Sequence, residues 1–247
     1  MLLFDAGNSR CKWVWMEKGK LLRQGILAND DPQCWQTLKQ TFTHYQPPQK
    51  ILVSNVAGDA VKKRLQALCD RWILPVEIIS ARSVQCGVHN AYENPGQLGS
   101  DRWASLIAAW SRVRQACLVV NCGTAITVDT LSATGEFIGG LIMPGIALMQ
   151  HSLLDNTKLA GKNNLGPEFQ GEVCDYPRNT ADAMMSGIVR ASVGAIRHQY
   201  DLLASEGPPH AIVSGGGAMT VIPNLGFSCD YVENLVLEGL HIIGQHG

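Results

Sequence analysis

The sequence predicts an α/β protein built from two similar halves, and three observations lead to that prediction. Short apolar runs typical of buried strands alternate with amphipathic helical patterns. A strand-turn-strand pattern that begins at Leu2 recurs after Cys117. The chain has 247 residues, 46% of them hydrophobic, which is enough for one large domain or two of ordinary size. We therefore expect a duplicated domain, with domains over 1–115 and 116–247.

The first element is a hairpin. An apolar strand ends in Asp5-Ala6-Gly7-Asn8-Ser9, and a second strand of alternating polarity follows at once. Glycine and asparagine are favoured in tight turns because they tolerate a positive φ. By itself this pattern predicts only a turn, since most such turns bind nothing.

The hairpin pattern is repeated in the second half of the chain. The segment that aligns with residues 5–9 is Asn121-Cys122-Gly123-Thr124-Ala125. At the same offset Gly19 falls on Gly135, so the alignment continues without a gap into the next turn. Residues 51–55 resemble 211–215 at a larger offset. Two copies of this size indicate a duplicated domain, and a chance match of short patterns is the alternative that the residues leave open.

The remaining elements follow from local patterns in chain order. Short apolar or alternating runs predict strands over 20–27, 51–56, 75–79, 139–144, 211–214 and 227–232. Apolar residues three and four positions apart predict helices over 35–41, 59–69, 146–154, 180–204 and from 234 onward. Segments rich in Gly, Asn and Pro predict loops over 85–98 and 156–179, the second of them mobile or in contact with a ligand.

A further helix is predicted from Ser100, because the apolar residues Trp103, Leu106, Ile107, Trp110 and Val113 fall on one stripe. Ser100 is the expected N-cap, which places Asp101 in the first turn. A carboxylate there either complements the helix dipole or serves in catalysis, and the residues alone leave both open. Beside the helix N-terminus, the pKa of Asp101 is expected to fall.

Composition excludes several classes of function. The net charge of −1 provides no basic field for nucleic acid or an anionic membrane. The eight cysteines are scattered, without a Cys-x-x-Cys pair or zinc-finger spacing, as is typical of thiols in a reducing compartment. The N-terminal pattern is not that of a signal peptide, because Asp5 interrupts the apolar run. We expect a cytoplasmic protein that binds neither nucleic acid nor membrane.

The duplicated glycine turns suggest a polyphosphate site. Turns at matching points of two domains can face each other across a central cleft and offer backbone N–H donors. Asp5 is placed to hold a hydrated Mg²⁺, and Lys12 to add positive charge. Neither G-x-x-x-x-G-K-[ST] nor G-x-G-x-x-G occurs, so a nucleotide site here is of another type.

Taken together, the motifs resemble a known family. They are Asp5-x-Gly7-Asn8-Ser9-x-x-Lys12, Tyr92-x-x-Pro95-x-x-Leu98-Gly99-x-Asp101-Arg102, Gly123-Thr124-Ala125-x-Thr127-x-Asp129, Gly139-Gly140-x-Ile142-x-Pro144-Gly145, Thr180 and Gly215-Gly216. In this order and spacing they resemble the type III pantothenate kinases, and the resemblance spans nearly the whole chain. It implies two ribonuclease H-like domains of the actin-like ATPase fold with a central cleft.

The resemblance also implies an activity and its residues. The reaction is transfer of the γ-phosphoryl group of ATP to pantothenate, giving 4′-phosphopantothenate in the first step of coenzyme A biosynthesis. ATP would be bound by Asp5, Ala6, Gly7, Asn8, Ser9, Arg10, Cys11, Lys12 and Thr124. Asp101 would be the general base, and pantothenate would contact Tyr92, Gly99, Ser100, Asp101 and Arg102. Family members are homodimers in which the residue at Thr180 reaches the partner's substrate.

One position departs from the family. The family commonly has an aspartate where this chain has Asn121, and that carboxylate is associated with a monovalent cation, K⁺ or NH₄⁺. Asparagine offers an oxygen without a charge, so we expect weaker cation dependence beside the Mg²⁺ that accompanies ATP. Two alternatives remain, namely a kinase of another small hydroxylated substrate and a non-catalytic accessory protein with a regulatory role in transcription.

Overall fold

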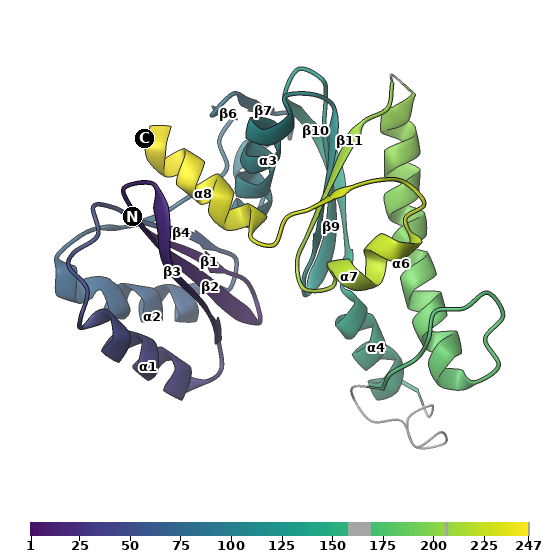
Figure 1. Cartoon of the computed structure of the whole chain (residues 1–247), viewed down its shortest axis with the longest axis horizontal. Helices are drawn as coiled ribbons and strands as arrows, with labels where there is room; N and C mark the ends of the chain where they lie inside the picture. The colour runs from purple at the N-terminus through teal and green to yellow at the C-terminus, as the bar shows by residue number, and fades with distance from the viewer. Residues whose placement is uncertain (158–168, 206, 247) are drawn as a thin grey trace. The chain divides into compact units, whose positions relative to one another are not determined.

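The computed structural model describes residues 1–157, 169–205 and 207–246 (Figure 1). The chain forms two compact units. Unit 1 comprises Met1–Arg114, Gly135–Ile138 and Asn234–Gly247, and unit 2 comprises Gln115–Thr134 and Gly139–Glu233. The expectation of domains over 1–115 and 116–247 stays a prediction; the two units differ from it by placing Gly135–Ile138 and Asn234–Gly247 in unit 1 and Gln115 in unit 2.

Unit 1 is built on a sheet of strand order β3-β2-β1-β4-β5. Its strands are β1 (Leu2–Ala6), β2 (Arg10–Glu17), β3 (Lys20–Ala28), β4 (Ile51–Asn55) and β5 (Val76–Ile78). Strands β1, β2 and β3 form an antiparallel meander, whereas β4 runs parallel to both β1 and β5. The central strands β1 and β4 are apolar because helices cover both of their faces.

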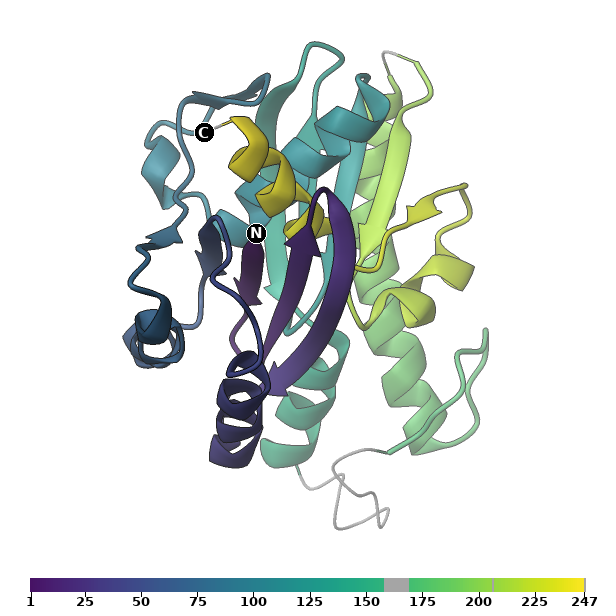
Figure 2. The same ribbon diagram turned by 60° about the vertical axis from the view of Figure 1, so that its left-hand side comes forward.

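Alternation along β1 and β4 decides which side chain faces which helices. Phe4 and Val53 belong to a core with α1 (Pro32–Phe42) and α2 (Asp59–Cys69). The opposite face packs against α3 (Ser100–Val113) and α8 (Leu235–His246), as the two views of unit 1 show (Figures 1 and 2). Asp5 alternates with Phe4, so its side chain lies on the face of α3 and α8.

Helices α3 and α8 pack very closely. A Cβ at Gly239 would collide with the backbone carbonyl of Ala104, so only glycine permits this approach. The contact is within unit 1 and explains why the C-terminal helix is part of it. Short elements complete this unit: β6 (Val84–Gln85), β7 (Val88–Asn90), and the 3₁₀ turns η1 (Asp70–Trp72) and η2 (Pro95–Gln97).

Unit 2 is built on strands in the order β12-β11-β8-β9-β10. They are β8 (Cys117–Cys122), β9 (Ala125–Leu131), β10 (Glu136–Pro144), β11 (His210–Ser214) and β12 (Asp230–Tyr231). The first residues of β10, Glu136 and Phe137, belong to unit 1 and pair there with β7. Its helices are α4 (Ile146–Asp155), α6 (Thr180–Ala204) and α7 (Ala218–Val221), with the 3₁₀ turn η3 (Ile222–Asn224). Apolar residues of β8, β9 and β11 pack against α6 to form its core.

Most predicted elements are confirmed. The helices over 59–69 and 180–204 begin and end where expected. The loop predicted over 85–98 is wrong in part, because β7 and η2 lie within it. The strand expected over 227–232 is reduced to β12. The loop predicted over 156–179 includes residues 158–168, which lie outside the described residues.

The gapless alignment of the two hairpins is also wrong. In unit 1 Ala6 pairs with Cys11, whereas in unit 2 Cys122 pairs with Ile126, so the second turn is one residue shorter. A longer connection between β9 and β10 than between β2 and β3 restores the offset by the time Gly135 is reached. The matching glycines therefore hide two compensating differences in length.

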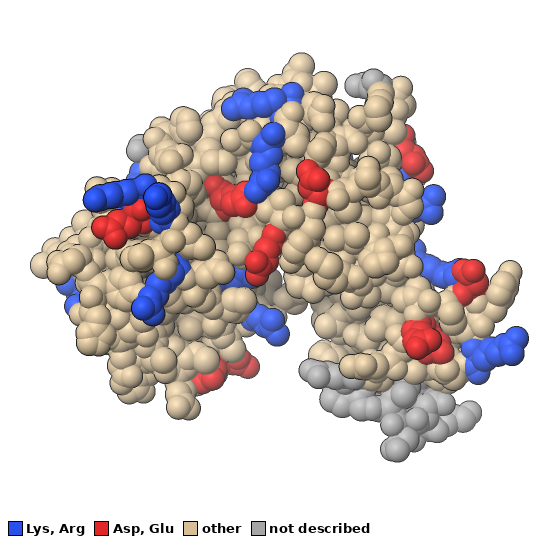
Figure 3. Space-filling view, in the orientation of Figure 1, with Lys and Arg blue, Asp and Glu red and all other residues tan. Residues whose placement is uncertain are grey.

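Charges of both signs are interspersed over the face of the molecule shown in Figure 3. This agrees with the net charge of −1. Among the described residues, no helix combines the length and apolar character needed to cross a membrane.

Candidate active site

The turn between β1 and β2 is held by a side chain from outside the hairpin. The side-chain amide of Asn29 donates to the carbonyls of Gly7 at 2.7 Å and Asn8 at 3.0 Å, and its backbone N–H donates to the Ser9 carbonyl at 3.1 Å. Asn8 and Ser9 are exposed. With its carbonyls bonded to Asn29, the turn keeps acceptor oxygens away from an approaching anion. No residue from Gly7 to Ser9 has a positive φ.

Asp5, Lys12 and Asp101 lie near one another in unit 1. Asp5 is directly opposite Lys12 in the β1–β2 register. Burial raises the pKa of Asp5 to about 7, the Asp101 carboxylate adds to the rise, and Lys12 opposes it. The Lys12 ammonium donates to the side-chain oxygen of Asn234 at 3.2 Å. The three charged groups form a cluster suited to a cation and a phosphate.

Asp101 lies in the first turn of α3, as predicted, but its expected acidity is wrong. Its Oδ1 accepts a hydrogen bond from the Arg102 N–H at 2.8 Å. Burial raises the pKa of Asp101, and this outweighs the lowering by the Arg102 N–H and charge. A carboxylate with a raised pKa is a better proton acceptor than the weak base expected from the helix N-terminus alone.

The N-cap of α3 also differs from the prediction. The helix begins at Ser100, and its N-cap is Gly99, which has no side chain to offer. The Ser100 hydroxyl instead lies 2.9 Å from the hydroxyl of Ser54 on β4, and both residues are buried. A Cβ at Gly99 would lie 2.7 Å from Asp101 Oδ1, so the carboxylate occupies the space that a larger residue would need.

Arg102 is held against two aromatic rings. Its guanidinium donates to the Tyr92 hydroxyl at 3.2 Å and lies 5.8 Å from the Tyr92 ring and 5.7 Å from the Phe137 ring. The two rings are 5.0 Å apart. Arg102 is only 5% exposed, so its charge is largely desolvated. A buried guanidinium beside a tyrosine hydroxyl can recognise a carboxylate ligand.

The turn between β8 and β9 in unit 2 is held by other backbone segments. The N–H of Gly145 donates to the Thr124 carbonyl and that of Gly217 to the Cys122 carbonyl, both at 2.9 Å. Gly215 has a φ of +96°, and a Cβ there would lie 2.7 Å from the Cys122 carbonyl carbon. Thr124 is exposed in this turn, and Asn121 is half-buried at the end of β8.

The predicted residues divide between the units. Unit 1 contains residues 5–12, Tyr92 and residues 99–102, and unit 2 contains Asn121, Thr124 and Thr180. Thr180 is the first residue of α6. Sequence reasoning missed Asn29, Ser54, Phe137 and Asn234, which come from separate strands or loops and match no motif.

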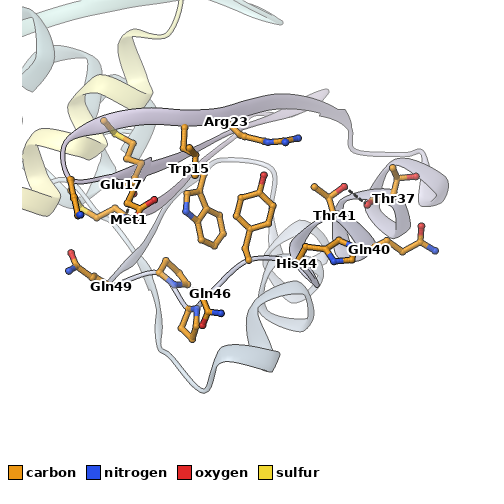
Figure 4. A pocket seen from close by; sticks show the side chains of 16 residues that line it. Met1, Trp15, Glu17, Arg23, Thr37, Gln40, Thr41, His44, Gln46 and Gln49 are labelled. Carbon is orange, nitrogen blue, oxygen red and sulfur yellow. Dashed lines mark hydrogen bonds between the residues drawn. The ribbon is translucent and has the colours of Figure 1, made fainter.

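A large cavity of unit 1 lies elsewhere. It has a volume of about 990 Å³, and its walls include Trp15 and Tyr45 together with Arg23 and His44 (Figure 4). None of the predicted site residues lines it.

Comparisons with known proteins agree with the motifs. Residues 1–202 match the family model of type III pantothenate kinases. A type III pantothenate kinase of Nitrosospira multiformis is 44% identical over 99% of this chain and 91% of its own. One of Nitrosomonas eutropha is 40% identical over 100% and 95%.

Solved structures show the fold. A Campylobacter jejuni protein described as a Baf family transcriptional activator has a TM-score of 0.61 at 22% identity, over 100% of this chain and 98% of its own. MreB 5 of Spiroplasma citri bound to AMPPNP has a TM-score of 0.54 at 11% identity, over 99% and 96%. The chain therefore has the actin-like ATPase fold, which confirms the predicted fold class.

Proposed function

Since this chain belongs to the type III pantothenate kinase family, we propose that it transfers the γ-phosphoryl group of ATP to the primary hydroxyl of pantothenate. The product is 4′-phosphopantothenate, and the reaction is the first step of coenzyme A biosynthesis. The observation that best supports this chemistry is the half-buried Asp101 in the first turn of α3, whose raised pKa suits a proton acceptor.

ATP binds through the two glycine turns. In unit 1 the segment from Asp5 to Lys12 carries the exposed turn whose carbonyls are bonded to Asn29. Backbone donors and the Lys12 ammonium meet the phosphate charge. In unit 2 the exposed Thr124 adds a hydroxyl from the second turn.

Asp5 would hold the Mg²⁺ that accompanies ATP. The carboxylates of Asp5 and Asp101 repel each other, and the pKa of Asp5 is raised to about 7. A cation bound at Asp5 would relieve this repulsion. Mg²⁺ is commonly held by one or two carboxylates, water and substrate phosphates, so these residues fit it. When bound, the ion neutralises charge on the transferring phosphoryl group.

Pantothenate binds beside Asp101. Arg102 and Tyr92 take the substrate carboxylate, and Gly99 and Ser100 line the chain of the substrate. Ser100 does this through its backbone, because its hydroxyl is bonded to Ser54. The protein acts as a homodimer, and Thr180 of one protomer reaches the substrate of the other. Its place of action is the cytoplasm.

Asp101 Oδ atoms accept the proton of the attacking hydroxyl. The oxygen of pantothenate forms a bond to the γ-phosphorus while the bond from that phosphorus to the β-bridging oxygen breaks, and ADP leaves. Because the transition state is loose, positioning matters more than early proton removal.

The direct test is an assay of purified protein with ATP, Mg²⁺ and pantothenate, in which 4′-phosphopantothenate should form. Asp101→Asn keeps the shape and should lower kcat by about 10²-fold or more with ATP binding little changed. If the protein phosphorylates another hydroxylated compound but not pantothenate, the result would favour a kinase of another small hydroxylated substrate. Absence of any turnover, over a range of K⁺ and NH₄⁺, would favour the accessory protein.

Monovalent-cation dependence should be weak. Asn121 supplies an oxygen but no charge, so activity in Na⁺ should be close to that in K⁺ or NH₄⁺. Asn121→Asp restores the charge and should make activity depend more strongly on K⁺. A steep dependence in the unmodified protein would mean that other groups bind the cation.

A further inference from the structure

We propose that Ser54, which no motif includes, is a positioning residue that fixes the first turn of α3, and with it Asp101, on the sheet that carries Asp5. The inference rests on the proposed function for its catalytic consequence. Its structural basis is the hydrogen bond between two buried hydroxyls that joins β4 to α3.

Ser54 is placed by the sheet. In the parallel pairing of β1 and β4, Ser54 is the partner of Asp5. Paired residues on neighbouring strands point to the same face, so both side chains lie on the face that α3 and α8 cover. Their neighbours Phe4 and Val53 point to the opposite face and pack in the core with α1 and α2.

The contact to α3 ties the first turn of a helix that no N-cap side chain holds to strand β4. Gly99 has no side chain to cap the helix, and the Ser100 hydroxyl bonds to Ser54 at 2.9 Å. Ser54 is 0% exposed and Ser100 is 7% exposed, so water competes little for this bond. Loss of either hydroxyl would leave the other buried without this partner.

The next residue along the helix is Asp101. Its Oδ1 accepts from the Arg102 N–H at 2.8 Å, and the absence of a side chain at Gly99 leaves room for it. The carboxylate is therefore fixed relative to the first turn of α3, and the bond from Ser54 fixes that turn relative to β4 and β1. Movement of the turn would move the base away from Asp5 and from the reacting hydroxyl.

Ser105 offers a matched control. It lies on the same helix, is also 0% exposed, and its hydroxyl has no hydrogen-bond partner among the described residues. Ser105→Ala removes a buried hydroxyl from α3 without breaking a link to the sheet.

The test compares Ser54→Ala, Ser100→Ala, their double variant and Ser105→Ala. Ser54→Ala should lower kcat about 5- to 20-fold with KM for ATP within about twofold, as expected for a small misplacement of a reacting group. Ser105→Ala should retain kcat. The double variant should regain part of the lost Tm, since no hydroxyl is left unpaired, yet its kcat should stay as low as that of Ser54→Ala.

Three results would overturn the proposal, and two of them are kinetic. One is that kcat falls in proportion to Tm across the four variants, which would mean that Ser54 contributes to stability alone. The other is a kcat of Ser54→Ala equal to that of Ser105→Ala. A readout independent of turnover is amide hydrogen exchange at residues 100–103, which Ser54→Ala should accelerate and Ser105→Ala should not. Unchanged exchange would reject the positioning role even in a protein that phosphorylates nothing.

Discussion

In unit 1 the glycine turn between β1 and β2 is held by a side chain, whereas in unit 2 the corresponding turn between β8 and β9 is held by backbone. Asn29 bonds the carbonyls of the first turn. Gly145 and Gly217 donate backbone N–H groups to the second, and Gly215 packs against it. Two turns with similar sequences therefore depend on different parts of the chain.

The difference extends to charge. The first strand ends near Asp5, whose carboxylate has a pKa raised to about 7, and the second ends near the uncharged Asn121. The first turn is thus suited to a cation with its phosphate, and the second to neutral hydrogen bonding. The duplicated sequence pattern thus accompanies two turns that differ in length, in support and in nearby charge.

The largest expected effect comes from Asp5, the charged residue beside the first turn. Asp5→Asn keeps the shape and removes the carboxylate, so kcat should fall by about 10²-fold, as when a preorganised electrostatic group is lost. Steady-state kinetics over a range of Mg²⁺ would measure this. Near-normal kcat in the variant would mean that the two turns do not differ in their chemistry.

The backbone-held turn should be sensitive to glycine replacement. Gly215→Ala forces a Cβ against Cys122 at a φ of +96° and should lower kcat/KM for ATP by about tenfold, with a loss of about 1–3 kcal/mol in stability. Gly216→Ala is the control, because a Cβ there meets nothing within 4 Å and φ is not positive. Equal effects of the two variants, measured by kinetics and thermal unfolding, would contradict backbone packing as the support of this turn.

The side-chain-held turn should weaken when its support is removed. Asn29→Ala eliminates the bonds to the Gly7 and Asn8 carbonyls and should raise KM for ATP about 3- to 10-fold, with a smaller change in kcat. Asn29→Asp is a stricter variant, since it keeps the size but loses the donor. The comparison fails if neither substitution alters KM for ATP.

The smallest effect is on stability as a function of pH. The pKa of Asp5 is raised to about 7 in the folded chain, so the folded state holds this proton at pH values where the unfolded chain has lost it. Ionisation of Asp5 thus makes the fold less stable as pH rises from about 4 to 7. Asp5 is only half-buried, and the amide that replaces it has its own cost of burial, so Asp5→Asn should recover only part of this loss. We expect Tm to rise by about 2–4 °C at pH 8, the shift that about 1 kcal/mol gives.

The measurement is thermal unfolding without nucleotide or Mg²⁺, at pH 4 and at pH 8. Little difference between the variant and the unmodified protein is expected at pH 4, where Asp5 is protonated in the folded state. A Tm gain of the same size at both pH values would assign the effect to packing and not to charge.

Local signals predicted much of the fold. The helix over 180–204 could be predicted because its pattern is local and continuous, and the structure adds an N-cap, Asn179, which accepts from the Asp182 N–H. The phosphate-type turns and the Asp101 segment could be found because each is contiguous in sequence.

Features that depend on distant residues could not be predicted in this way. The acidity of Asp101 follows from burial, which its position in the helix does not reveal. Ser54 and Ser100 are 46 residues apart and belong to different local patterns. The unequal lengths of the two glycine turns also could not be predicted. The shorter second turn is followed by a longer connection, so Gly19 and Gly135 still align at the same offset.

The close packing of Gly239 against Ala104 also bears on the order of assembly during synthesis. The chain leaves unit 1 after Arg114 and returns to stay at Asn234, so nearly all of unit 2 is made in between. Until α8 emerges from the ribosome, the face of α3 that it covers has no partner. The packing of the helix that carries Asp101 is thus completed only after the last segment of unit 1 has been made.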